Sequence, residues 1–121
     1  MKSSLIQEKS YAFALRIIPF CHLLREKREY ELASQLIRCG TSIGSNVEEA
    51  LAGVSRADFI AKMAIASKEA RETNFRLRLL RDTKIVPLKE IETLINESLE
   101  LVRILTSIVK TSQTSPAKTK N

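Results

Sequence analysis

Apolar side chains recur at alternating three- and four-residue steps through most of this 121-residue chain, and this period restricts the fold more than any other feature. The period divides the chain into four segments. The first starts at Ser4, the second runs from about Tyr30 to Ala52, the third is capped by Ser55, and the fourth follows Pro87. The apolar stripes are Ile6, Phe13, Ile17, Phe20 and Leu24; Leu32, Leu36, Cys39, Ile43, Val47, Ala50 and Val54; Phe59, Met63, Ala66, Ala70, Leu77 and Leu80; and Ile91, Leu94, Ile95, Leu101, Val102, Leu105, Ile108 and Val109. Such steps are typical of amphipathic helices that face a common core.

Short links between long amphipathic helices make neighbouring helices antiparallel. The sequence therefore predicts an all-α, up-down-up-down antiparallel four-helix bundle over residues 1–111. The last stretch, "TSQTSPAKTKN", has no apolar anchor, so we expect residues 112–121 to form a disordered tail.

The stretch "RCGTSIGSN", from Arg38 to Asn46, contains two of the three glycines, Gly40 and Gly44. A phosphate-binding loop would need a lysine after the second glycine or a strand before the first, and neither is present. A membrane helix-packing motif is excluded by nearby charges such as Arg38 and Glu49. The apolar period also continues in phase on both sides. We therefore place both glycines inside a helix, where each costs roughly 1 kcal/mol relative to alanine, and expect close packing against a neighbouring backbone to offset that cost.

The composition restricts the fold class and the cellular compartment but does not indicate a function. Aromatic residues make up only 5% of the chain, which favours helices over a β-sandwich. We find no signal peptide and no run of about 18 apolar residues that could span a membrane. Cys21 and Cys39 are then expected to be reduced thiols in a cytoplasmic protein.

A polar stripe follows the glycines on the second helix. It consists of Gln35, Arg38, Ser42, Ser45, Asn46 and Glu49. One interpretation is a solvated face; the other is partial burial with hydrogen bonds to the third helix. If helices two and three turn near residue 54, Arg38 lies near Glu69 or Glu72, and Glu49 lies near Asp58 or Lys62.

Reactive groups that could form a catalytic or metal site do not converge in this pattern. His22 is the only histidine, and helical geometry points it about 100° away from Cys21. The Glu-x-x-His elements that build a carboxylate-bridged metal site in a bundle are also missing. We therefore expect no enzyme activity, no metal and no cofactor.

The net charge is +6, and Arg71, Arg78, Arg81 and Lys84 follow helical spacing along one flank of the third helix, with Asn74 among them. Such a flank could bind the backbone of RNA or DNA without sequence preference, although no helix-turn-helix pattern is present.

Ile65, Phe75 and Leu79 lie off the apolar stripe of the same helix. They could be buried inside the bundle or covered by another subunit. An oligomeric adaptor that binds another protein is therefore the alternative function.

The segments "QLIRCGTSIGSNVEEA" and "DFIAKMAIASKEARETNFRLRLL" resemble the bacterial four-helix bundle family called 23S rRNA intervening sequence proteins. Residues at the matching positions are Gln35, Arg38, Ser42, Ile43, Asn46, Glu49, Ala50, Ile65, Ala66, Glu69 and Glu72. The resemblance covers about residues 5–110 and implies a homopentamer with no settled biochemical activity. Accessory proteins of diversity-generating retroelements look similar, and that likeness implies binding to nucleic acid and to a reverse transcriptase.

Overall fold

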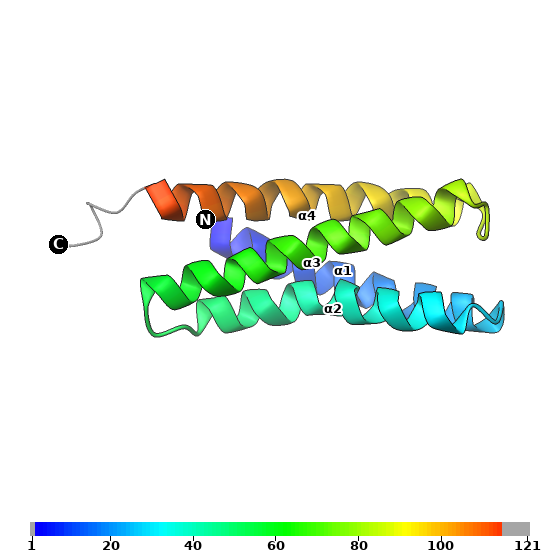
Figure 1. Cartoon of the computed structure of the whole chain (residues 1–121), viewed down its shortest axis with the longest axis horizontal. Helices are drawn as coiled ribbons and strands as arrows, with labels where there is room; N and C mark the ends of the chain where they lie inside the picture. Colours follow the sequence, from blue (N-terminus) through cyan, green and yellow to red (C-terminus); the bar gives the residue numbers. More distant parts are fainter. Residues whose placement is uncertain (1, 115–121) are drawn as a thin grey trace.

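The computed structural model describes residues 2–114, and the side chains from Ser4 onward. Four helices follow one another: α1 (Lys2–Glu26), α2 (Tyr30–Leu51), α3 (Arg56–Asp82) and α4 (Leu88–Thr114). The described residues contain no strand, so the all-α prediction is confirmed. Figure 1 shows the four helices lying side by side along one long axis.

The bundle has the expected up-down-up-down order. Each helix packs against its neighbours in sequence, and α4 also packs against α1. Within the described chain the backbones of the diagonal pairs, α1 with α3 and α2 with α4, do not approach each other closely. Consequently α1 and α3 occupy opposite corners of the bundle, and in Figure 1 α3 passes in front of the fainter α1.

The predicted apolar stripes form one continuous core. Its largest fully buried side chains include Phe13, Ile17, Leu36, Ile43, Met63, Leu77, Ile91 and Leu105. Val54 is an exception: it is 97% exposed, because α2 ends at Leu51 and Val54 lies in the link to α3. The expectation that Val54 extends the α2 stripe was therefore wrong.

Helix ends follow local chemistry. Ser55 accepts a hydrogen bond from the backbone N–H of Asp58 (3.1 Å), which is the predicted cap of α3. At the opposite end of the bundle, Arg28 and Lys84 have φ angles of 66° and 62° just after α1 and α3. In both turns the next backbone N–H, of Glu29 or Ile85, reaches back to a carbonyl five residues earlier. These are helix-terminating Schellman turns in which a basic residue occupies the position where glycine is common.

The predicted boundary of the C-terminal tail was also wrong. Residues 112–114 belong to α4, whose helical period continues through Thr114. The remainder of the predicted tail, residues 115–121, lies outside the described residues.

Candidate functional site

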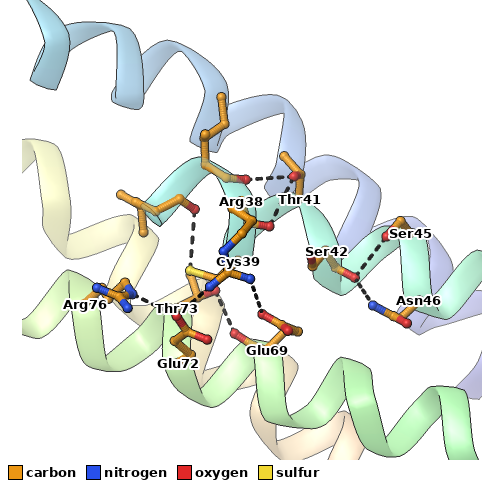
Figure 2. A network of polar contacts seen from close by, with 12 residues as sticks. Arg38, Cys39, Thr41, Ser42, Ser45, Asn46, Glu69, Glu72, Thr73 and Arg76 are labelled. Carbon is orange, nitrogen blue, oxygen red and sulfur yellow. Dashed lines mark hydrogen bonds and ion pairs between the residues drawn. The ribbon is translucent and has the colours of Figure 1, made fainter. Parts of the chain in front are cut away.

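A polar network joins α2 to α3 along one side of the bundle (Figure 2). Arg38 lies between two carboxylates of α3: its Nη2 is 2.9 Å from Glu72 Oε2 and its Nη1 is 3.6 Å from Glu69 Oε1. Arg76 donates to the same Glu72 oxygen at 3.0 Å and to the side-chain oxygen of Gln35. The structure therefore brings Gln35, Arg38, Glu69 and Glu72 together, as their spacing suggested.

The ion pairs of this network lie at the surface of the bundle. The Arg38 side chain is 56% exposed, so its ion pairs are largely solvated. Pairs of this kind contribute at most about 1 kcal/mol each. Glu69 Oε1 is buried and accepts no hydrogen bond from the described residues, and Arg38 is its nearest cation. The ion pairs and the bond from Arg76 to Gln35 join α2 to α3 and so help to hold the two helices in register.

The remaining members of the polar stripe take different partners. Asn46 Nδ2 donates to the carbonyl of Ser42 at 2.9 Å, and Ser45 Oγ donates to the same carbonyl at 3.3 Å. Both bonds stay within α2, so hydrogen bonding of these residues to another helix is not seen. Glu49 does reach α3, where its Oε1 is 2.9 Å from Lys62 Nζ, and this carboxylate raises the pKa of the lysine.

Both glycines lie against α1, but their contacts differ. A Cβ atom at Gly40 would approach the Ile17 side chain to 3.1 Å. At Gly44 it would stand 3.5 Å from the backbone oxygen of Ser10, an ordinary van der Waals distance. The expected neighbouring backbone is thus found at Gly44, whereas the tight contact is at Gly40 and involves a side chain.

The predicted basic flank of α3 is less continuous than its spacing suggested. Arg81 forms an ion pair with Asp82 at 2.7 Å. Lys84 is not on the helix, because α3 ends at Asp82 and Lys84 adopts the left-handed turn that follows. Arg71 donates to Thr106 Oγ1 of α4 at 2.9 Å. Arg78 donates to Asn74 Oδ1 at 2.8 Å, and its guanidinium carbon lies 5.8 Å from the centre of the Phe75 ring.

A buried polar pair between α3 and α4 was missed in the sequence. Asn74 Nδ2 donates to Ser98 Oγ at 3.0 Å, and both side chains are buried. Ser98 Oγ in turn donates to the carbonyl of Ile95 at 2.9 Å. The available signal was position. Asn74 directly follows Thr73, which stands three residues after Ala70 and four before Leu77 of the apolar stripe, so Asn74 lies at the edge of that stripe.

The candidate reactive residues differ in burial. His22 is exposed, whereas Cys21 and Cys39 are buried free thiols. Burial raises the pKa of the Cys21 thiol to about 12, with a smaller contribution from the neighbouring Cys39. Burial raises the pKa of Cys39 as well. Among the described residues, no three His, Cys, Asp or Glu side chains are arranged to hold a metal ion.

Large apolar side chains are exposed on all four helices, and α1 and α3 carry more of them than α2 and α4. Ile65, Phe75 and Leu79 of α3 are 41%, 49% and 44% exposed, so the bundle does not bury them internally. Tyr11, Leu15 and Ile18 of α1 are also exposed. The α1 group was missed in the sequence, although its four- and three-residue steps place it opposite the core stripe.

Helices able to cross a membrane were sought in the described part of the chain, and none of them is long and apolar enough.

Comparison with known proteins supplies the family. Residues 2–107 match the family model described as 23S rRNA-intervening sequence protein. A solved structure from Bacteroides thetaiotaomicron, described as a protein with unknown function from the S23 ribosomal protein family, is 42% identical to this chain. The alignment covers 91% of this chain and 99% of that one, with a TM-score of 0.85. No curated protein matches the sequence.

Proposed function

The chain belongs to the 23S rRNA-intervening sequence protein family, and on that premise we propose that it is a non-enzymatic helical module that assembles with copies of itself and acts through protein contacts. The observation that carries this proposal is the exposure of large apolar side chains on the outer sides of both α1 and α3. Contiguous apolar groups on a protein surface mark sites of protein association. The family resemblance suggests five copies in the assembly.

We further infer that the module works in the cytoplasm, because both cysteines are free thiols rather than a disulfide. We assign it no catalytic role, because the polar network is built from ion pairs and amide hydrogen bonds that join two helices. The exposed apolar and basic side chains are suited to binding another molecule.

The test of assembly is the mass of the purified chain in solution, measured by light scattering at micromolar concentration and by native mass spectrometry. A mass several times that of the 13.7 kDa chain is expected. A monomer over the whole concentration range would overturn the proposal.

A second function, binding of a nucleic-acid backbone, is favoured by two exposed arginines of α3. Arg71 and Arg78 bind polar neutral side chains and form no salt bridge among the described residues, and the net charge is +6. The resemblance to accessory proteins of diversity-generating retroelements is a further reason to test it. Affinity for a random RNA should then fall steeply as salt rises. Failure to bind at low salt, or affinity that does not change with salt, would eliminate this function.

A further inference from the structure

We propose that a pocket between α3 and α4 binds a phosphate group through Ser67, Arg71 and Lys110. The pocket has a volume of about 260 Å³ and opens to solvent toward the end of α4. Its polar lining consists of Ser67, Arg71, Thr106, Lys110 and Gln113, and the other lining residues are apolar. This inference rests on the second proposed function, nucleic-acid binding, for the nature of its ligand, and it adds a discrete site that holds one phosphate.

The first support is the hydroxyl of Ser67, which is buried without a hydrogen-bond partner. The residue is only 9% exposed, and it lines the pocket. The other buried hydroxyls of the described chain, those of Ser10, Thr73 and Ser98, each donate to a carbonyl of their own helix. We find no acceptor for Ser67 among the described residues. A buried hydroxyl without a partner costs free energy, and a ligand oxygen in the pocket would supply the missing acceptor.

The second support is that both helices hold hydrogen-bond donors at the pocket. Arg71 Nη2 donates to Thr106 Oγ1 at 2.9 Å, which holds the guanidinium against α4. A guanidinium has several N–H donors, so the others remain available to an anion. Thr106 accepts this bond, and its own hydroxyl hydrogen is donated to no described residue. Guanidinium, ammonium and hydroxyl groups are the side-chain groups that bind phosphate oxygens in proteins.

The third support is the charge of the pocket. Arg71 and Lys110 line it, and no carboxylate of the described chain does. The pocket between α1 and α4 is different, because it is lined by three carboxylates and its Arg16 is already paired with Glu97 at 2.6 Å. An anion is therefore attracted to the pocket between α3 and α4 and not to the pocket between α1 and α4.

The size and lining of the pocket suit a phosphate group more than a whole nucleotide. Its volume is below the range of about 300–1,000 Å³ in which most pockets for larger organic ligands fall. No aromatic side chain of the described residues lines it, so it offers no surface on which a base could stack. Recognition would depend on charge and hydrogen bonds and would read no sequence. A free phosphate ion and a phosphate of an RNA backbone share this chemistry, and two probes distinguish them.

The first probe is inorganic phosphate, added to the full chain in a calorimetric titration at constant ionic strength. Ser67→Ala should weaken phosphate binding about tenfold, because it removes a hydrogen bond to a charged group. The same substitution should leave the stability of the phosphate-free chain to urea unchanged or slightly higher, because this hydroxyl has no partner in the fold. Lys110→Gln should also weaken binding, because it removes one of the two cations that line the pocket.

Each variant has a matched control on α4. Ser98 is buried between the same two helices, but its hydroxyl is bonded to Asn74 and to the carbonyl of Ile95. Ser98→Ala should therefore lower stability and leave the affinity for phosphate unchanged. Lys89→Gln removes the same charge as Lys110→Gln at a site roughly 30 Å away along the helix, and it should keep the wild-type affinity.

The second probe is a fluorescently labelled random RNA at low salt, and its outcomes separate the pocket from the proposed function. Phosphate binding that Ser67→Ala weakens supports the pocket. RNA binding that the same substitution weakens, and with which phosphate competes, identifies the RNA backbone as the source of the phosphate. If RNA does not bind, nucleic-acid binding is eliminated, and the pocket is assigned to a free phosphate. Absence of phosphate binding, or equal affinity in the wild type and Ser67→Ala, would overturn the pocket even if RNA binds to Arg71 and Arg78.

Discussion

At the scale of single residues, Gly40 and Gly44 show that two glycines four positions apart need not serve the same purpose. Gly40 is buried and faces the branched side chain of Ile17, so an added methyl group would be crowded from two directions. Gly44 faces the Ser10 carbonyl with room for a methyl group at ordinary contact distance. The helix cost of about 1 kcal/mol is therefore offset by a tight fit at Gly40 and by little at Gly44.

This difference predicts opposite results for the same substitution. Gly44→Ala should stabilise the fold by up to about 1 kcal/mol, because alanine has the better helix propensity and meets no close atom. Gly40→Ala should give less stability than Gly44→Ala, because Ile17 must move to admit the methyl group. Urea unfolding followed by circular dichroism measures both free energies. Equal stabilisation by the two substitutions would show that the Ile17 contact is not tight.

At the scale of helices, the contact between α3 and α4 depends on a buried polar pair within an apolar seam. Asn74 reaches across to Ser98, and its own oxygen accepts from Arg78 on the outside. Such a pair costs desolvation energy, and its expected contribution is to fix the height of one helix against the other rather than to add net stability.

Removing one partner or both should therefore have different effects. Asn74→Ala should destabilise the fold by roughly 1–3 kcal/mol, because it leaves a cavity and removes the hydrogen bond to Ser98. Replacing both, with Asn74→Leu and Ser98→Ala, should cost less, because no polar side chain then remains at the contact. Chemical denaturation of the two variants provides the comparison. The idea fails if the double variant is the less stable of the two.

The helices, their ends and their contacts also show which parts of the structure could be predicted from the sequence. The four helices and the Ser55 cap were predictable because periodicity and capping act within a few residues of the chain. The pairing of Arg38 with Glu72 and of Glu49 with Lys62 was predictable because a short link fixes which residues of α2 and α3 are level. The turns at Arg28 and Lys84 were not, because a left-handed residue without glycine leaves little trace in the sequence.

At the scale of the whole molecule, the arrangement of helices decides which residues remain outside. Tyr11 and Phe75 belong to helices at opposite corners, and this relation appears only once all four helices are packed. The contacts of the basic flank were not foreseen for a related reason. Spacing along α3 does not reveal that Thr106 of α4 stands close enough to bind Arg71. Surface patches depend on neighbours distant in sequence, whereas the core stripes do not.

The buried thiols make global stability depend on alkaline pH. Burial raises the folded-state pKa of Cys21 from 9.0 to about 12, so between these values the unfolded chain releases a proton that the folded chain keeps. The stabilising contribution of this group is complete below pH 9 and is lost as the pH rises toward 12.

We therefore expect the free energy of unfolding to fall above pH 9, with this one thiol contributing up to about 1.4 kcal/mol per pH unit. Cys21→Ala should be less stable than the wild type at pH 7 because of the cavity it leaves, and the gap between the two should narrow from pH 9 to pH 10.5. Urea unfolding at fixed protein concentration with a reductant present measures that gap, and Cys21→Ser serves as a control that lacks the titrating thiol but has nearly the same shape. A gap that stays constant with pH for both variants would show that Cys21 is not shielded from ionising in the folded chain.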